Sequence, residues 1–230
     1  MILLDIEGTT TPISFVTETL FPYARSHLAP FLERNGRSID GLKIIGRLHR
    51  EHAVDRRRSA VVPPWSAKGY AEWLMDQDRK SPALKELQGR IWEEGYKDGS
   101  LAGQVFEDVP RAFMRWRDAG VPIAIYSSGS VRAQQWLFRT TAAGDLTPFI
   151  SHHFDTAVGP KNDPGSYVRL AKTVGLEPGA IAFVSDVVSE LHAARMAGFA
   201  TIFSERQGNR PQPAHTHRVV RSFDDISDPL

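Results

Sequence analysis

The sequence of 230 residues contains no cysteine. It can therefore hold no disulfide, thiolate metal site, iron–sulfur cluster or cysteine nucleophile. It also lacks an apolar run that approaches the roughly 20 residues of a membrane-spanning helix. The chain begins with four apolar residues, but Asp5 and Glu7 follow at once, unlike the longer apolar stretch of a signal peptide. We expect a cytoplasmic protein with no membrane partner.

An excess of charge of one sign is also missing. Lys and Arg number 28 against 27 Asp and Glu, which gives a net charge of +1. This balance excludes a polycation made for nucleic acid and a strongly acidic disordered chain. Hydrophobic residues make up 41% and charged residues 24%, as in soluble globular proteins. We expect a globular protein with no nucleic-acid partner. Composition does not determine the oligomeric state, and a monomer is taken as the starting expectation.

Residues 1–13 and 106–230 share one sequence pattern. They contain short apolar runs, typical of buried parallel strands, which are separated by helical patterns that begin near proline and end near glycine. This alternation predicts an α/β fold, with a doubly wound parallel sheet. The runs are Ile2–Leu4, Val121–Ser127, Ala180–Ser185 and a weaker one at Phe199–Phe203.

Residues 14–105 show a different pattern. They contain no convincing strand, and their apolar residues recur at helical spacing. Four helices fit this segment, with breaks near Gly36, Pro63-Pro64 and Pro82. The chain is therefore predicted to consist of a core, formed by residues 1–13 and 106–230, and a helical insertion of residues 14–105.

Polar residues follow three of the predicted strands at the point where each strand ends, and Lys161 precedes a predicted helix. Because ligands of open parallel sheets bind at the carboxyl ends of the strands, these side chains are candidates for a site. Each one alone is more commonly a turn residue, a helix cap or a solvated side chain. Together they place two acidic clusters, a hydroxyl pair and a lysine at one sheet edge. They are Asp5, Glu7, Ser127, Ser128, Gly129, Lys161, Asp186 and Glu190.

The order of these residues resembles the haloacid dehalogenase superfamily of phosphatases. Its four motifs are a strand followed by Asp-x-Asp-Gly-Thr, a strand that ends in Ser or Thr, a Lys before a helix, and a strand followed by acids. Here they correspond to Asp5-Ile6-Glu7-Gly8-Thr9, to Ser127, to Lys161, and to Asp186 with Glu190. The resemblance implies a haloacid dehalogenase-like core in which residues 14–105 form a helical cap.

Glu7 stands where most phosphatases of this superfamily have Asp. With this glutamate, the run from Asp5 to Thr10 is similar to the enolase-phosphatases of methionine salvage. Those enzymes are phosphoric monoester hydrolases (acireductone synthases). The resemblance implies a phosphate ester substrate, 2,3-diketo-5-methylthiopentyl-1-phosphate. The enzyme would enolise it and then remove its phosphate to give the acireductone 1,2-dihydroxy-3-keto-5-methylthiopentene.

The chemistry of phosphate esters suggests a role for the acids. A carboxylate nucleophile and an anionic phosphate repel each other, and a Mg²⁺ ion between them removes that repulsion. Mg²⁺ prefers oxygen ligands and needs only one or two carboxylates, which Asp5 and Asp186 can provide. The resemblance implies that the backbone carbonyl of Glu7 completes the metal site. It also implies that Asp5 attacks phosphorus and forms an aspartyl-phosphate.

The remaining residues would bind the phosphate or support the site. By resemblance, Lys161 would hold both a phosphoryl oxygen and the Asp5 carboxylate. Ser127, and the backbone amides near Ser128 and Gly129, would donate hydrogen bonds to phosphate oxygens, as the turn between a strand and a helix can. Glu190, four residues after Asp186, could orient Lys161 or a metal-bound water.

Other functions stay open. The main alternative is a general sugar-phosphate phosphatase or phosphomutase of the same superfamily, although Glu7 argues against it. A haloacid dehalogenase fits less well, because the acids suit a cation that such an enzyme does not use. A phosphorylatable signalling domain would be about half as long and would have no helical insertion. A binding protein with an inactive site would be plausible if Asp5 were missing, but it is present.

Overall fold

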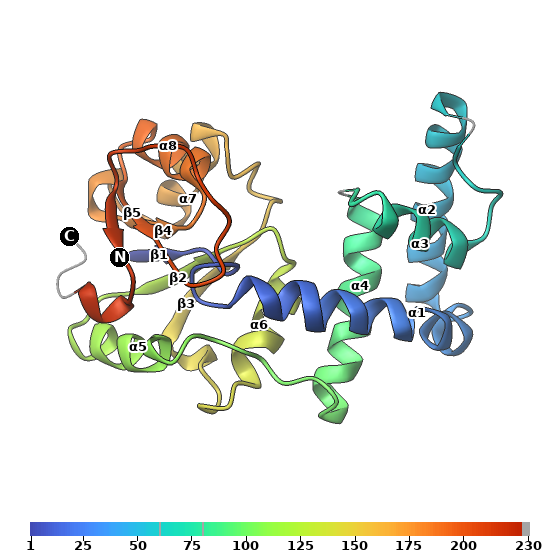
Figure 1. Ribbon diagram of the computed structural model, residues 1–230, viewed down its shortest axis with the longest axis horizontal. Coiled ribbons are helices and arrows are strands. Elements are labelled where there is room, and N and C mark those ends of the chain that lie inside the picture. The colour runs from blue at the N-terminus through green and yellow to red at the C-terminus, as the bar shows by residue number, and fades with distance from the viewer. Residues whose placement is uncertain (60, 80, 227–230) are drawn as a thin grey trace. The chain divides into compact units, whose positions relative to one another are not determined.

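The computed structural model describes residues 1–59, 61–79 and 81–226. The chain divides into two compact units. The first, the sheet unit, consists of Met1–Val16 and Ala102–Leu230, and the second, the helical unit, is Thr17–Leu101. Figure 1 shows the sheet and its helices in the first unit and helices alone in the second. No helix of the described residues is long and apolar enough to cross a membrane.

The sheet unit is built on six parallel strands within the described residues, which confirms the predicted doubly wound α/β fold. Their spatial order is β3-β2-β1-β4-β5-β6. Four strands match the predicted apolar runs to within a few residues, whereas β3 and β6 were not predicted. The strands are β1 (Ile2–Leu4), β2 (Ile123–Tyr126), β3 (Ile150–Phe154), β4 (Ala182–Ser185), β5 (Ala200–Ser204) and β6 (Arg218–Val220).

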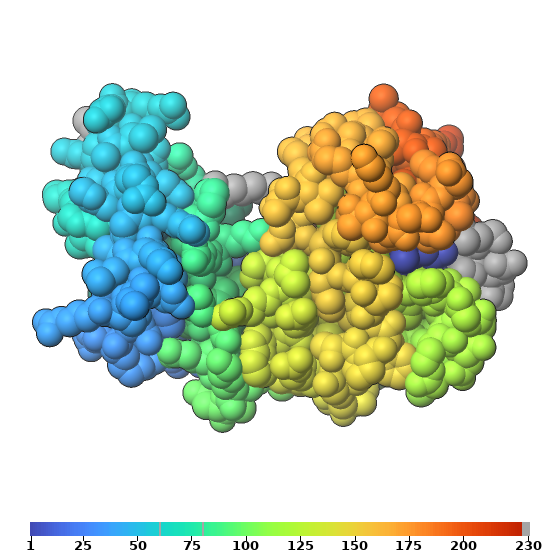
Figure 2. Space-filling view, turned by 180° about the vertical axis from the view of Figure 1, so that it is seen from behind, coloured from blue at the N-terminus to red at the C-terminus, as the bar shows by residue number. Residues whose placement is uncertain are grey.

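Helices cover both faces of the sheet, with α5 and α6 on one side and α7 and α8 on the other (Figure 1). Parallel strands are joined by right-handed crossovers in nearly all proteins, and crossovers that lead in opposite directions from β1 place helices on both faces. Figure 2 shows the covering segments from the reverse side, coloured from green through yellow to orange. The helices are α5 (Asp108–Asp118), α6 (Val131–Arg139), α7 (Pro164–Val174) and α8 (Val188–Met196), with short 3₁₀ turns at Thr147–Phe149, Pro178–Ala180 and Phe223–Asp225.

Local sequence signals explain where these helices begin and end. The side chain of Ser130 accepts a hydrogen bond from Ala133 N at 3.3 Å at the start of α6. The Asp163 carboxylate accepts one from Gly165 N at 2.9 Å at the start of α7, where Pro164 occupies the first turn. Gly175 ends α7 with a φ of 72°, a conformation that favours glycine.

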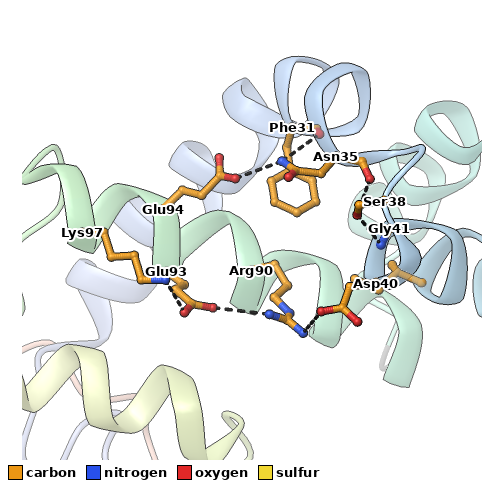
Figure 3. Close-up of a pocket in the computed structure, with 10 residues that line it drawn as sticks. Phe31, Asn35, Ser38, Asp40, Gly41, Arg90, Glu93, Glu94 and Lys97 are labelled. Carbon is orange, nitrogen blue, oxygen red and sulfur yellow. Dashed lines mark hydrogen bonds and ion pairs between the residues drawn. The ribbon is translucent and has the colours of Figure 1, made fainter.

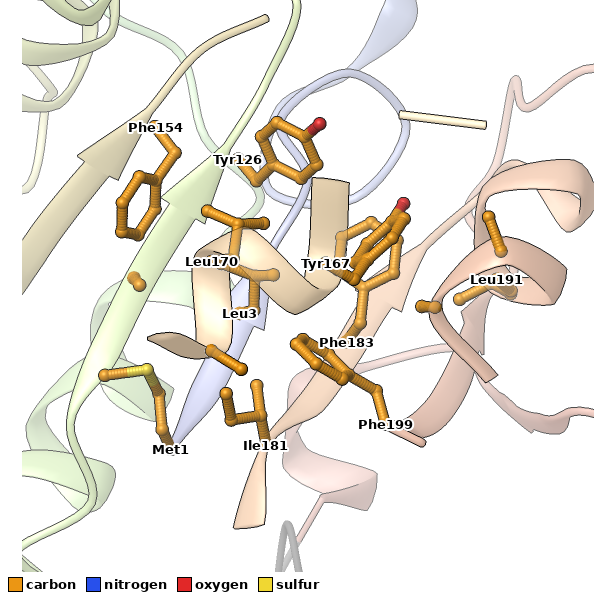
Figure 4. Close-up of a cluster of buried hydrophobic side chains, with 14 of the residues drawn as sticks. Met1, Leu3, Tyr126, Phe154, Tyr167, Leu170, Ile181, Phe183, Leu191 and Phe199 are labelled. Carbon is orange, nitrogen blue, oxygen red and sulfur yellow. The ribbon is translucent and has the colours of Figure 1, made fainter. Parts of the chain in front are cut away.

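The core between the sheet and helices α7 and α8 is rich in aromatic residues. Leu3, Tyr126 and Phe183 project from three neighbouring strands and pack against Tyr167 of α7 and Leu191 of α8 (Figure 4). Burial of each large apolar side chain contributes about 1.5–3 kcal/mol. This layer therefore fixes α7, and the loop before it, against the strands that end at the candidate site.

Strand β1 lies at the centre of the sheet. Leu4 pairs with Ile125 of β2 on one side and with Val184 of β4 on the other. The chain proceeds outward in opposite directions from this point, so the boundary between β1 and β4 is the topological switch point where ligands of such sheets bind. Asp5 follows β1 and Asp186 follows β4 at this boundary.

The helical unit contains four α-helices within its described residues, as predicted, and the breaks fall near Gly36, Pro63-Pro64 and Pro82. Serine side chains cap three of them by accepting hydrogen bonds from Gly41 N, Gly69 N and Leu84 N at 2.9–3.0 Å. A π-helix, Phe15–Leu20, precedes the first. The helices are α1 (Phe21–Asn35), α2 (Ile39–Arg58), α3 (Ala67–Asp76) and α4 (Pro82–Asp98).

Candidate active site

A buried lysine lies between two carboxylates at the carboxyl edge of the sheet. The Nζ of Lys161 is 2.6 Å from Asp5 Oδ1 and 2.6 Å from Glu190 Oε2. Asp5 follows β1, Lys161 precedes α7 and Glu190 lies in the first turn of α8. Burial opposes the charge of Lys161, but the two carboxylates outweigh it and raise the pKa of the lysine. Lys161 is therefore a fixed cation beside Asp5.

Ser185, the last residue of β4, links the same two acids. Its Oγ lies 3.0 Å from Asp5 Oδ2 and 3.2 Å from Glu190 Oε2, so its single proton can serve one of them at a time. It also accepts a hydrogen bond from Val187 N at 3.1 Å. The other oxygen of Asp5 accepts from Ile6 N at 2.8 Å. Both oxygens of Asp5 are thus held in a defined orientation.

Two tyrosines support the loop that carries Lys161. Tyr167 donates a hydrogen bond to the carbonyl of Lys161 at 2.7 Å, and Tyr126 donates to the carbonyl of Gly159 at 2.9 Å. The Nζ of Lys161 lies 5.7 Å from the ring centre of Tyr126 and 5.8 Å from that of Phe183. These aromatic faces add a favourable cation–π environment. The packing of these aromatic core residues therefore helps to fix the position of Lys161.

Asp186 is buried beside this cluster, and in the described part of the chain no ion pair joins it to a cationic side chain. Burial, and then the charge of Asp5, raises the pKa of Asp186 to about 7, although Lys161 acts in the opposite direction. Burial also raises the pKa of Glu190, although its contact with Lys161 acts in the opposite direction. Three acids thus share one lysine, and this site would be stabilised by a further cation.

The glycine at position 8 brings the loop after β1 close to Asp186. Gly8 has a φ of 68°, and a Cβ atom built on it would lie 2.3 Å from Asp186 Oδ2. Only glycine permits this approach. The side chain of Glu7, one residue earlier, is exposed, and its backbone forms a bridge with Thr11.

Ser127 and its neighbours form the turn between β2 and α6. Ser127 is buried, and its Oγ accepts a hydrogen bond from Gly129 N at 3.1 Å. Ser128 is exposed. Gln134 holds the turn by donating to the carbonyls of Gly129 at 3.0 Å and Phe154 at 2.8 Å. Strands β1 and β2 are parallel, and Leu4 pairs with Ile125. The turn after β2 therefore lies at the same edge of the sheet as Asp5.

The structure therefore joins Asp5, Lys161 and Glu190 by direct contacts and places Asp186 next to them. Ser185, Tyr167 and Gln134 also support the site, and their roles were not predicted from the sequence. The one signal for Ser185 was its position at the end of a predicted strand, directly before Asp186. The other two are polar residues inside helices, which have no distinctive sequence pattern.

A cavity of about 200 Å³ lies in the helical unit (Figure 3). Its charged side chains pair with one another: Arg90 lies 3.0 Å from Asp40 and 3.8 Å from Glu93, and Lys97 lies 2.7 Å from Glu93. Asn35 donates to Glu94 at 2.9 Å. These paired groups satisfy one another, so this cavity is a weaker candidate for phosphate chemistry than the Asp5 cluster.

An acid, a lysine and a second acid lie together at the switch point of a parallel sheet, the arrangement that the resemblance to haloacid dehalogenase-like hydrolases implies. A family profile described as haloacid dehalogenase-like hydrolase matches residues 1–198. The chain belongs to this family.

Several relatives are similar over nearly the full length of the chain, and they carry one name. Enolase-phosphatase E1 of Synechococcus elongatus is 46% identical over 231 residues, covering 98% of this chain and 96% of that protein. Enolase-phosphatase E1 of Drosophila persimilis is 45% identical, with 98% and 94% covered. Enolase-phosphatase E1 of Sorangium cellulosum is 44% identical, with 98% and 96% covered.

Solved structures show the same fold. The crystal structure of the UTR4 protein of Saccharomyces cerevisiae matches with a TM-score of 0.80 and 32% identity, covering 97% of this chain and 98% of that one. The CbbY structure of Rhodobacter sphaeroides in complex with phosphate matches with a TM-score of 0.61, 98% and 95% coverage, and 18% identity. At that identity, the second likeness shows the fold alone.

Proposed function

We propose that this chain is a Mg²⁺-dependent enolase-phosphatase of methionine salvage. It enolises 2,3-diketo-5-methylthiopentyl-1-phosphate and then removes its phosphate, which leaves the acireductone 1,2-dihydroxy-3-keto-5-methylthiopentene. The observation that carries the proposal is the buried Asp5–Lys161–Glu190 cluster at the switch point of the sheet. Relatives named enolase-phosphatase E1, at 43–46% identity, support the choice of substrate.

The charges of the site fit a divalent cation. Asp5, Asp186 and Glu190 share one lysine, which leaves a formal excess of two negative charges when all are ionised. The described residues contain no group of three or more His, Cys, Asp or Glu arranged to hold a metal. Mg²⁺ does not need one, because it keeps several waters and uses one or two carboxylates. Asp5, Asp186 and the carbonyl of Glu7 would hold it.

Phosphoryl transfer follows from the positions of the side chains. An oxygen of Asp5 forms a bond to phosphorus while the bond from phosphorus to the substrate oxygen breaks, and that oxygen then gains a proton. Lys161 remains charged and stabilises the negative charge on the phosphoryl group. Water then hydrolyses the aspartyl-phosphate and restores the Asp5 carboxylate. When bound, Mg²⁺ would shield the repulsion between the two anions and polarise a carbonyl group for enolisation.

Phosphate binding is assigned to the turn after β2. Ser127 and Ser128 would provide neutral donors at the start of α6, where the helix dipole favours an anion. The amide of Gly129 supports them, because it donates to Ser127 Oγ at 3.1 Å and so orients that hydroxyl. Glu190 accepts the second contact of Lys161 and so orients the ammonium group toward Asp5. The small-molecule phosphate is therefore held by neutral donors and one fixed cation.

We assign residues 14–105 as the cap that closes during turnover, and the enzyme is expected to act as a monomer. Closure of a cap would exclude water and supply substrate contacts. Small-angle scattering of the full chain with Mg²⁺, before and after addition of beryllium fluoride, tests both points. Beryllium fluoride mimics an acyl phosphate, so the profile should become more compact at a monomeric mass. An unchanged profile with beryllium fluoride bound would reject the cap assignment.

Phosphate release from a panel of esters tests the function. The panel contains the diketone phosphate and common sugar phosphates, each with Mg²⁺ and with a chelator. We expect release that requires Mg²⁺ and favours the diketone phosphate. The control is Asp118→Asn, since Asp118 is exposed and pairs with its neighbour Arg117. A preference for sugar phosphates would support the general phosphatase instead, and full activity after chelation would reject the metal.

A further inference from the structure

Two side chains donate hydrogen bonds to the carbonyl of Gly8, and both come from β5 or the segment that follows it. Strand β4 separates β5 from β1 in the sheet. Asn209 Nδ2 donates to the Gly8 carbonyl at 3.0 Å, and Ser204 Oγ donates at 3.2 Å. Ser204 is the last residue of β5, and Asn209 lies in the segment between β5 and β6. The same Nδ2 also donates to the carbonyl of Ser204 at 3.0 Å. The segment after β5 thus fixes the loop that follows β1.

The other end of the Asn209 amide has no hydrogen-bond partner among the described residues. Its Oδ1 is buried. The orientation of the amide is determined, because two carbonyl acceptors require the NH₂ group on their side. Leaving a buried acceptor unsatisfied costs about 1–3 kcal/mol. A purely structural asparagine would be expected to satisfy both ends, so this oxygen indicates a missing donor.

The unpartnered oxygen lies near the Asp186 carboxylate, on the same side of Gly8. The point that a Cβ atom of Gly8 would occupy lies 2.9 Å from Asn209 Oδ1 and 2.3 Å from Asp186 Oδ2. An amide oxygen and a carboxylate oxygen therefore lie close to one point beside the Cα of Gly8. Both are acceptors, so a hydrogen-bond donor or a cation is needed to satisfy them. Both lie beside the peptide of Glu7 and Gly8.

We propose that Asn209 is a positioning residue of the magnesium site. Its Nδ2 fixes the Gly8 carbonyl, and so the orientation of the adjacent Glu7 peptide, while its Oδ1 accepts a hydrogen bond from water that hydrates the cation beside Asp186. This inference rests on the proposed function, because it takes the Glu7 carbonyl and Asp186 as metal ligands. Groups that orient metal ligands typically change metal affinity by about 10- to 100-fold when removed.

Calorimetric titration of the full chain with Mg²⁺, without substrate, tests the inference. Asn209→Ala should raise the Mg²⁺ dissociation constant about 10- to 100-fold. Ser204→Ala removes one of the two donors to Gly8 and should raise it by a smaller factor. Gln207→Ala is the matched control, because Gln207 is an exposed amide in the same segment, and it should bind Mg²⁺ like the wild type.

A kinetic measurement separates positioning from a general structural role. In Asn209→Ala, the Mg²⁺ concentration for half-maximal phosphate release should rise by the same factor, while KM for the ester at saturating Mg²⁺ stays within about twofold. A folded Asn209→Ala protein with wild-type Mg²⁺ affinity overturns the inference and leaves the proposed function intact. If Asn209→Ala does not fold, wild-type affinity in Ser204→Ala overturns it. A wild-type chain that binds no Mg²⁺ rejects the metal-dependent function itself.

Discussion

The ammonium group of Lys161 lies 2.6 Å from Asp5 Oδ1, and both side chains are more than nine-tenths buried. A buried ion pair of this kind is costly to desolvate, and hydrophobic residues could stabilise a fold equally well. Its position at the carboxyl end of the central strand indicates a chemical role instead. Lys161 places a positive charge directly beside the Asp5 carboxylate and fixes its orientation.

Replacement of Lys161 by Met should damage both activity and stability. The variant leaves Asp5 and Glu190 facing each other without a cation, which costs about 3–5 kcal/mol of unfolding free energy. Phosphate release should fall by about 100- to 1,000-fold, the usual loss for one electrostatic donor. Chemical denaturation and turnover of the diketone phosphate measure the two effects. Lys172→Met, at an exposed position of α7, is the control, and an equal loss there would refute the interpretation.

Replacement of Gly8 by Ala should abolish Mg²⁺-dependent phosphate release. The new Cβ would lie 2.3 Å from Asp186 Oδ2, so either the loop or the carboxylate must move. Gly120 is a matched control, since its φ is also 68° but a Cβ there meets nothing within 4 Å. Gly120→Ala should cost only the strain of the left-handed conformation, about 1–2 kcal/mol, with activity retained. Near-native activity in Gly8→Ala would contradict the proposed position of the metal.

His217 should make the fold sensitive to acid. Its Nδ1 lies 2.6 Å from Arg195 Nη2 and 2.8 Å from Thr201 Oγ1. Burial, and then Arg195, lowers the pKa of His217 from 6.5 to about 4. Because the unfolded chain binds the proton more readily, the stability that comes from neutral His217 is present above pH 6.5 and is lost as the pH falls toward 4.

The variant His217→Gln tests this pH dependence, because glutamine keeps a neutral acceptor and cannot titrate. Unfolding free energies of both proteins are measured by urea denaturation between pH 4 and pH 7, a range that runs from the shifted pKa to just above the ordinary one. The wild type should lose more stability than the variant as the pH falls. The other histidines are common to both proteins, so parallel pH profiles would show that His217 does not contribute.

The two strands that the sequence did not predict are the two edges of the sheet. In β3, Ser151, His152 and His153 interrupt the apolar pattern, because an edge strand is only partly covered. In β6, three residues are too few to show a period, and Arg218 and Val219 are exposed. The central strands are buried on both faces and therefore gave continuous apolar runs.

The sequence also predicted which polar residues would gather at the sheet edge. Lys161, Asp5 and Glu190 meet there, although their roles stay predictions. The supporting contacts were not predictable, because they join positions far apart in the chain. Ser185 reaches Asp5 across 180 residues, and Asn209 reaches Gly8 across 201. No local pattern indicates such a pairing, which depends on how the strands are ordered.

Anaerobic mixing of the purified protein with the diketone phosphate and Mg²⁺ tests the proposed function most directly. Ultraviolet absorbance of the conjugated enol and inorganic phosphate are followed together. We predict that the enol rises first or simultaneously, that phosphate never precedes it, and that Asp5→Asn blocks phosphate release while part of the enolisation remains. Phosphate release without an enol product, or near-native phosphate release by Asp5→Asn, would contradict an enolase-phosphatase that acts through Asp5.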